Sequence, residues 1–167
     1  MESFAPQVGD GCRVLVLGTA PSLRSIELQQ SYGHAQNLFW PIMGELFGAG
    51  PGLHYAERIR RLHSRGVGIW DVFASCDRPG SLDSSIVRAS EVPNDIEGLL
   101  RARPSIRALA LNGGKAQQAY RRHVDAVMEP ALRARVMLLD LPSTSPANAS
   151  MSREHKHVRW RALLDWA

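Results

Sequence analysis

Four short stretches of the chain are hydrophobic along their whole length, and this pattern is typical of buried β-strands. They are rich in Val, Ile and Leu and do not alternate with polar residues, as is common in strands that are covered on both faces. We predict strands at residues 13–17, 67–73, 106–111 and 136–141.

The segments between and after these strands carry hydrophobic residues at helical spacing. We predict helices at 55–65 and 116–127, and another that begins where Asn94 and Glu97 have capping-box spacing. A C-terminal helix is expected to bury Trp160, Leu163, Leu164 and Ala167 and to leave Arg153, Lys156, His157 and Arg161 elsewhere on its surface.

Strands that are separated by helices predict an α/β fold. We expect three α/β/α layers around a central, mostly parallel four-stranded sheet. No repeat, low-complexity tract or linker divides the chain, so residues 1–167 are expected to form one domain.

Composition narrows the class of protein. Of the 167 residues, 44% are hydrophobic and 22% are charged, which is usual for a soluble globular domain. No hydrophobic run is long enough to span a bilayer, and the N-terminus does not resemble a signal peptide. Two cysteines, Cys12 and Cys76, are too few for a four-cysteine iron–sulfur or zinc site. We therefore expect a cytoplasmic protein, nucleoid-associated if it is bacterial, without metal or organic cofactor and without a membrane partner.

Positive charge increases toward the C-terminus. The net charge is −2 for residues 1–50, +2 for 51–110 and +4 for 111–167. This gradient is compatible with a polyanionic partner. However, 18 of the 20 basic residues are arginine, which also fits a chain that uses arginine on ordinary solvated faces. Both interpretations stay open.

Small and polar residues follow each predicted strand, at 18–22, 74–81, 112–115 and 142–148, and Asp71 lies at the end of the second strand. In parallel sheets, ligands bind beyond the carboxyl ends of the strands. Loops in general favour such residues, but the loops that precede the strands contain fewer of them. We therefore predict a site at this edge.

Common nucleotide and metal motifs do not fit the chain. Residues 112–115, Asn-Gly-Gly-Lys, lack the upstream glycine and the Ser or Thr of a P-loop. His155 and His157 are two positions apart on a predicted helix and face different directions, which makes a poor metal pair.

Two segments are far more particular. Residues 33–44 read Gly-His-Ala-Gln-Asn-Leu-Phe-Trp-Pro-Ile-Met-Gly, and residues 141–149 read Leu-Pro-Ser-Thr-Ser-Pro-Ala-Asn-Ala. With the other loops they resemble the uracil-DNA glycosylase superfamily, most closely its hypoxanthine (deoxyinosine) branch, over roughly residues 12–166. The resemblance implies a base-excision repair hydrolase that turns a deaminated nucleotide out of DNA and cleaves its N-glycosidic bond.

The resemblance also implies roles around the flipped base. Better-known branches align water with a carboxylate or amide in the first loop, where this chain has Ala20. In the deoxyinosine branch the catalytic amide comes from the segment that here contains Asn37, although Asn37 is also a favoured helix N-cap. Tyr32 is expected to stack on the base, and Asp71 to accept hydrogen bonds from its edge. Gly18, Thr19 and Ala20 are expected to present backbone N–H groups to the departing base.

The expected DNA contacts lie on the later loops and on the C-terminal helix. Ser143 is expected to contact phosphate, although small residues replace the histidine and the bulky wedge that several relatives carry in this loop. The predicted set is Asn112, Gly113, Lys115, Ser143, Thr144, Ser145 and Arg153, with Lys156 as a further backbone clamp.

Three other functions stay open. A uracil or G:T/G:U mismatch glycosylase would use the same pocket residues. A lesion-binding module without turnover would fit Ala20 and the missing wedge, and an enzyme acting on a small phosphate compound would fit residues 112–115. For the glycosylase we expect a monomer that acts chiefly on hypoxanthine in double-stranded or single-stranded DNA.

Overall fold

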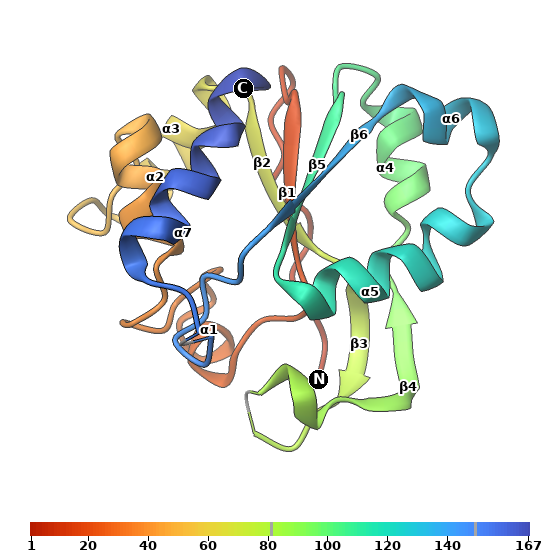
Figure 1. Ribbon diagram of the computed structural model, residues 1–167, viewed down its shortest axis with the longest axis horizontal. Coiled ribbons are helices and arrows are strands. Elements are labelled where there is room, and N and C mark those ends of the chain that lie inside the picture. The colour runs from red at the N-terminus through yellow and green to blue at the C-terminus, as the bar shows by residue number, and fades with distance from the viewer. Residues whose placement is uncertain (81, 149) are drawn as a thin grey trace.

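A parallel four-stranded sheet forms the centre of the molecule. The computed structural model describes residues 1–80, 82–148 and 150–167. The sheet has the order β2-β1-β5-β6, and every neighbouring pair is parallel (Figure 1). Its strands are β1 (Val14–Gly18), β2 (Val67–Asp71), β5 (Ala108–Asn112) and β6 (Met137–Leu141).

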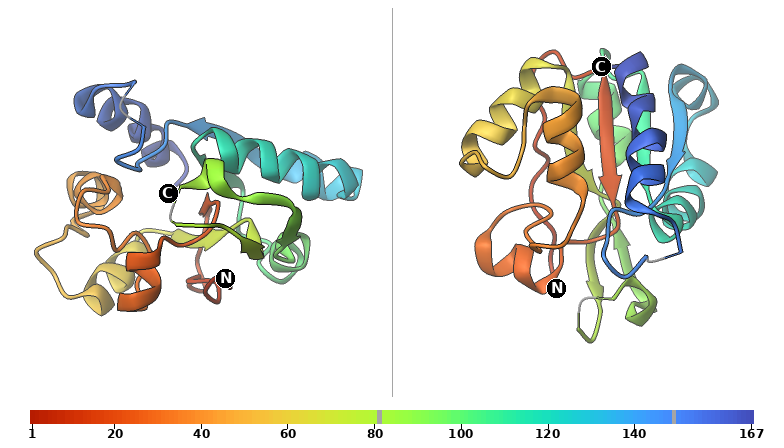
Figure 2. Two further views of the ribbon diagram at one scale, coloured as in Figure 1. Left: turned by 90° about the horizontal axis from the view of Figure 1, so that it is seen from below. Right: turned by 60° about the vertical axis from the view of Figure 1, so that its left-hand side comes forward.

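Helices cover both faces of this sheet, which confirms the predicted α/β/α arrangement (Figures 1 and 2). One face carries α2 (Phe39–Phe47), α3 (Tyr55–Ser64) and α7 (Arg153–Trp160). The other carries α4 (Ile96–Ala102), α5 (Gly114–His123) and α6 (Pro130–Arg135). Short 3-10 turns follow α5 at Asp125–Val127 and α7 at Arg161–Asp165.

Each face of the sheet has its own hydrophobic cluster. In β1, Val14 and Val16 pack toward α2, α3 and α7, whereas Leu15 and Leu17 pack toward α4, α5 and α6. All four side chains are fully buried. This explains why the strands show no polar alternation, since neither face meets water.

A separate antiparallel hairpin lies beyond the lower end of the sheet, on the opposite side from the short helix α1 (Leu23–Leu28) (Figure 1). It consists of β3 (Phe73–Asp77) and β4 (Val87–Pro93), with a 3-10 turn at Asp83–Ser85 between them.

The hairpin corrects the prediction of one strand over 67–73 followed by a loop. The parallel strand ends at Asp71, and the N–H of Val72 donates to Gly18 O at 2.8 Å before Phe73 begins the new strand. β4 is mostly exposed, and therefore it has no hydrophobic pattern that would mark it in the sequence.

The C-terminal region differs from prediction at two residues. Leu164 is 47% exposed, because α7 ends at Trp160 and the chain continues as a tighter 3-10 turn. Lys156 is buried, with its ammonium donating to Asn148 O at 2.7 Å, so it supports the preceding loop from inside.

One helix start also differs by a residue. α4 is capped by Asp95, whose Oδ1 accepts from the N–H of Gly98 at 2.9 Å, and not by Asn94. Asn94 instead donates to the backbone oxygen of Asp71 at 2.8 Å.

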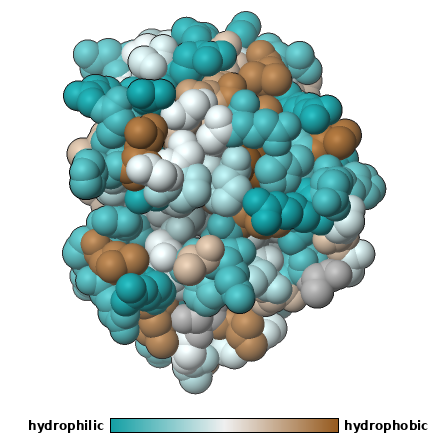
Figure 3. Space-filling model, turned by 90° about the vertical axis from the view of Figure 1, so that its left-hand side faces the viewer, coloured by the Kyte–Doolittle hydropathy of each residue, from teal (hydrophilic) through white to brown (hydrophobic). Residues whose placement is uncertain are grey.

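On the face that carries α2 and α3, hydrophobic side chains are scattered in small groups among hydrophilic ones (Figure 3). In the part of the chain that the structure describes, no helix has both the length and the apolar character that crossing a bilayer needs.

Candidate active site

A cavity of about 560 Å³ opens at the carboxyl ends of the four parallel strands. Loops that follow all four strands line it, as the sequence predicted, together with residues of the β3–β4 hairpin. The predicted site residues that line it are Gly18, Thr19, Ala20, Tyr32, Asn37, Asp71, Asn112, Ser143, Thr144 and Ser145.

The floor of the cavity is formed where β1 and β2 end side by side. Gly18 and Asp71 are partners in the parallel register. A Cβ added at Gly18 would lie 2.7 Å from Asp71 Oδ1 and 3.0 Å from Tyr32 Oη, closer than such atoms can pack. Because Gly18 has no side chain, the Asp71 carboxyl and the Tyr32 hydroxyl can both lie against it.

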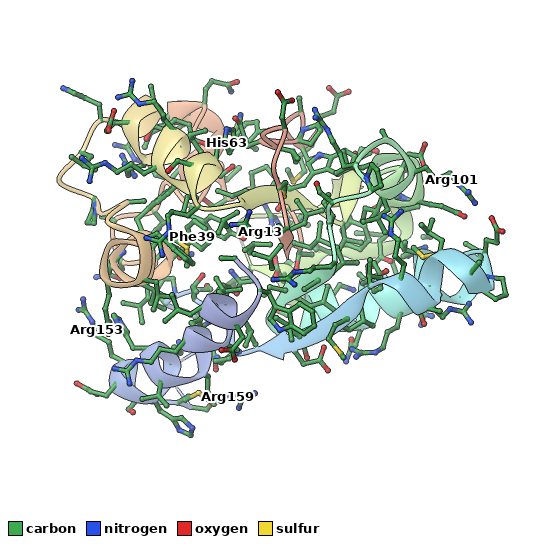
Figure 4. The ribbon with its side chains drawn as sticks, turned by 90° about the horizontal axis from the view of Figure 1, so that it is seen from above. Arg13, Phe39, His63, Arg101, Arg153 and Arg159 are labelled. Atoms are coloured by element: carbon green, nitrogen blue, oxygen red, sulfur yellow. The ribbon has the colours of Figure 1, made fainter. Side chains whose placement is uncertain are left out.

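Tyr32 is held in an uncommon conformation from two sides. Its backbone is left-handed, with φ of 56°. Its ring stacks on Phe39, with centroids 4.0 Å apart and planes at 24°, and its hydroxyl accepts from Asn112 Nδ2 at 3.3 Å. Phe39 points from α2 toward the interior of the molecule (Figure 4). The ring is thus fixed before any ligand arrives.

Asn37 lies just before α2 and lines the cavity. Its Oδ1 accepts from the N–H of Phe39 at 2.9 Å, so the side chain supports the start of the helix although Leu38 is the formal N-cap. The N–H of Leu38 donates to Thr144 O at 3.0 Å, which ties the segment to the last loop. An amide oxygen has two lone pairs, so Oδ1 can accept a second hydrogen bond from the cavity side.

Asn112 braces two walls of the cavity. It is buried, with Nδ2 donating to Tyr32 Oη and, at 3.0 Å, to Thr144 Oγ1, while Oδ1 accepts from the N–H of Thr144 at 3.0 Å. Its amide is therefore engaged within the protein. The neighbouring Gly113 has φ of 91°, and a Cβ there would lie 2.8 Å from the Cβ of Ser143. Gly113 does not line the cavity but lets the two loops meet.

Besides Gly113, two of the predicted DNA-binding residues lie outside the cavity. Lys115 pairs with Glu91 of β4, Nζ to Oε1, at 2.9 Å. Arg153 is exposed at the outer edge of α7 and lines a separate small depression with Glu45 and His157 (Figure 4). Their contacts with DNA stay predictions.

Arg78 and Asp83 are cavity residues for which the sequence predicted no role. The Arg78 side chain is 1% exposed. Its Nη1 lies 3.3 Å from Asp83 Oδ1 and 3.5 Å from Ala20 O, and its Nη2 donates to Pro21 O. Arg78 thus ties the hairpin to the first loop. Its place in the polar segment 74–81 was the available signal, and only the fold of the hairpin turns it inward.

The cavity floor disfavours negative charge. Burial raises the pKa of Asp71 to about 7, the charge of Asp83 adds to this rise, and Arg78 opposes it. Burial also raises the pKa of Asp83, with Thr19 and Arg78 opposing. Two carboxyl groups that resist ionisation therefore face one cavity.

Comparison with known families identifies the fold. Residues 5–166 match the family model described as the Uracil DNA glycosylase superfamily. The chain belongs to this superfamily. It is 33% identical over 163 residues to a Methanosarcina acetivorans protein named Hypoxanthine DNA glycosylase, covering 96% of each chain. A Methanosarcina barkeri protein of the same name is 31% identical over 134 residues, covering 80% of this chain and 78% of the relative.

A solved structure of the uracil-DNA glycosylase superfamily is also similar. The solution NMR structure of a Methanosarcina acetivorans protein, described as a candidate uracil DNA glycosylase, superposes with a TM-score of 0.80. The two chains are 31% identical, with 97% of this chain and 94% of the other covered.

In this uracil-DNA glycosylase superfamily member, the first loop contributes no acidic or amide side chain to the cavity. Ala20 lines it with a methyl group, which can neither orient nor deprotonate water. Asn37, the amide to which the resemblance assigned catalysis, does line the cavity.

Proposed function

We propose that this protein is a monofunctional DNA glycosylase of base-excision repair. It hydrolyses the N-glycosidic bond of a flipped deaminated nucleotide, chiefly deoxyinosine, and leaves an abasic site. The observation that carries the proposal is that Asn37, Tyr32 and Asp71 line one cavity at the strand ends. The names of the two Methanosarcina relatives support hypoxanthine as the base.

The cavity suits a base that has left the DNA stack. Flipping costs a few kcal/mol and is easiest for a mispaired base. Stacking of the base on the part of Tyr32 that Phe39 leaves uncovered would recover about 1–3 kcal/mol. Because Asn112 and Phe39 already fix the ring, little ordering is left to be done on binding.

Asn37 has the chemistry for the hydrolytic step. Its Oδ1 accepts a hydrogen bond from water and directs the water oxygen to C1′ of the sugar. The new C1′–O bond replaces the C1′–N9 bond, whose electron pair leaves with the base, and the proton released from water passes to solvent. Gly18, Thr19 and Ala20 line the cavity, and their backbone N–H groups are proposed to stabilise the charge that develops on the departing base.

The residues that line the cavity favour water over a lysine side chain as the nucleophile. Among the described residues that line it there is no lysine, and Lys115 is paired with Glu91 outside it. This supports an enzyme that removes the base without cutting the DNA strand.

The proposed DNA path runs over the last loop and the start of α7. Ser143, Thr144 and Ser145 border the cavity, and Arg153 lies exposed beyond them. Phosphate contacts of this kind make affinity fall as salt rises. We propose that one monomer binds the damaged strand of double-stranded or single-stranded DNA.

The test uses end-labelled duplexes that contain deoxyinosine, deoxyuridine, deoxyxanthosine or mismatched thymidine, followed by alkaline cleavage at abasic sites. We expect the fastest release from deoxyinosine. Release of uracil without release of hypoxanthine would show that uracil is the substrate. Binding to the deoxyinosine duplex without any abasic product would show that the protein is a lesion-binding module. Strand cleavage before alkali would contradict the monofunctional mechanism.

A further inference from the structure

The cavity floor contains an arrangement that the proposed function does not explain. Asp71 lies at the end of β2, and Asp83 reaches the same cavity from the turn between β3 and β4. In the described part of the chain, these are the only carboxyl groups that line it. Two carboxylates that face one cavity repel each other, so one of them tends to keep its proton.

Arg78 acts on both carboxyl groups but pairs directly with Asp83. Its guanidinium is buried and lies 3.3 Å from Asp83 Oδ1. The carbonyl groups of Ala20 and Pro21 hold the same guanidinium in place. The ion pair favours the charged form of Asp83 against the burial that raises its pKa. Burial is the main cause that favours the neutral form of Asp71, and a charged Asp83 adds to it.

The other ionisable groups around the cavity do not reverse this order. Tyr32 has its pKa raised by burial, so it stays a neutral hydroxyl. His34 lines the cavity and accepts from the N–H of Gln36 through Nδ1 at 3.1 Å. Lys115 acts on Asp83 from outside and favours its charged form.

A neutral carboxyl group differs chemically from the acceptor that the sequence predicted at Asp71. It has one O–H donor and one carbonyl acceptor. Hypoxanthine presents the complementary pair, because deamination creates a carbonyl beside a ring N–H. As the base departs, negative charge grows on that carbonyl oxygen. A donor stabilises this charge, whereas a carboxylate would oppose it.

We propose that Asp83 is a positioning residue that keeps a proton on Asp71, so that the Asp71 carboxyl donates to the carbonyl oxygen of the departing base and accepts from its ring N–H. This inference rests on the proposed function for its substrate, but the state of Asp71 is a property of the free protein.

The first experiment measures single-turnover release of hypoxanthine between about pH 5.5 and pH 9, on both sides of the expected midpoint. The wild type should lose rate about tenfold per pH unit above a midpoint near the Asp71 pKa of about 7. Asp83→Asn should move this midpoint down by about one pH unit. Asp71→Asn, which cannot lose a proton here but keeps a donor and an acceptor, should abolish the alkaline loss.

Two matched variants serve as controls. Asp77→Asn changes an exposed carboxylate on the same hairpin, and His34→Gln removes the histidine of the cavity. Neither should move the alkaline midpoint. An unchanged midpoint in Asp83→Asn, a persistent alkaline loss in Asp71→Asn, or its disappearance in His34→Gln would overturn the inference.

The second experiment does not depend on activity. Carboxyl ¹³C NMR of the free protein, with Asp71 assigned by its absence in Asp71→Asn, should show titration near pH 7 in the wild type. The midpoint should be lower in Asp83→Asn. If the wild type releases no hypoxanthine but Asp71 titrates in this way, the proposed function fails and the inference about its proton stands. Titration of Asp71 near the ordinary aspartate value would refute the inference whatever the activity.

Discussion

Two walls enclose the cavity, and different kinds of interaction hold them in place. The wall from Tyr32 to Phe39 is held by buried aromatic packing, with Phe39 stacked on Tyr32 and in edge contact with Trp160. In the hairpin wall, β3 buries Phe73 and Cys76 in the hydrophobic core, whereas β4 is mostly exposed, with Val87 and Val92 about half exposed. Charges make the remaining contacts of this wall.

Those charges form two groups. Arg78 pairs with Asp83 at the cavity, and the buried carboxylate of Glu91 pairs with Lys115 at 2.9 Å and with His123 at 2.8 Å. Hydrophobic packing involves no titrating group, whereas ion pairs respond to pH and are screened by salt. We therefore propose that the aromatic wall positions the water and base, and that the hairpin wall controls the charge they meet.

The largest effect is expected in the aromatic wall. Asn37→Ala should lower single-turnover release of hypoxanthine by about 10²–10³-fold, because nothing then orients the water. Binding to the damaged duplex, measured by fluorescence anisotropy, should persist. Gln36→Ala, an exposed neighbour outside the cavity lining, is the control and should keep its rate. Full activity in Asn37→Ala would move catalysis to another residue.

The pH dependence of stability should report the ionisation of Asp71, on the cavity floor between the two walls. The pKa of Asp71 is higher in the folded state, about 7, than its ordinary value of 3.8, so the folded protein binds more protons between these values. Stability from Asp71 is therefore present at low pH and lost as pH rises toward 7.

Asp71→Asn should remove this loss. In urea unfolding it should exceed the wild type by on the order of 3 kcal/mol at pH 8 and lose that advantage near pH 4. A constant difference across this range would show that Asp71 ionises normally.

A smaller effect on activity is expected when a methyl group is added at Gly18, on the cavity floor. Gly18→Ala places a Cβ against Asp71 Oδ1 and Tyr32 Oη, so it should displace one of them and lower activity by about tenfold. Gly11→Ala introduces a methyl group with no atom within 4 Å and is the matched control. Equal rates for the two variants would mean that the floor does not contact the base.

The smallest effect tests how the hairpin wall is anchored. Glu91→Gln removes the charge of a fully buried side chain, and it should lower the free energy of unfolding by about 1–2 kcal/mol and speed hydrogen exchange in β4. Glu97→Gln, whose carboxylate is partly exposed beside Arg101, should cost less than about 1 kcal/mol. Equal effects would mean that the buried charge does not anchor the hairpin.

The central sheet could be predicted because strands covered on both faces are continuously hydrophobic, as β1 and β5 are. The convergence of the loops then followed from parallel strands ending at one edge. The hairpin could not be predicted, since β4 is exposed and its one buried side chain, Glu91, is polar.

The positions of Arg78, Asp83 and Lys156 in the fold could not be predicted either. Each is a charged residue that sequence patterns place in solvent. Arg78 is held by the distant carbonyl groups of Ala20 and Pro21. Asp83 and Lys156 are held by the nearer Arg78 and Asn148, in loops whose course the sequence did not predict. For Asn112, the position at the end of a strand was close to the prediction, but its hydrogen bonds to Tyr32 and Thr144 could not be predicted.

The most direct test of the account is a crystal structure of the protein bound to a duplex that contains 2′-fluoro-2′-deoxyinosine, whose glycosidic bond resists hydrolysis. The account predicts the base inside the cavity against Tyr32, its carbonyl edge toward Asp71, and a water within about 3.2 Å of Asn37 Oδ1 facing C1′. A base bound elsewhere, or an Asn37 amide remote from the sugar, would contradict it.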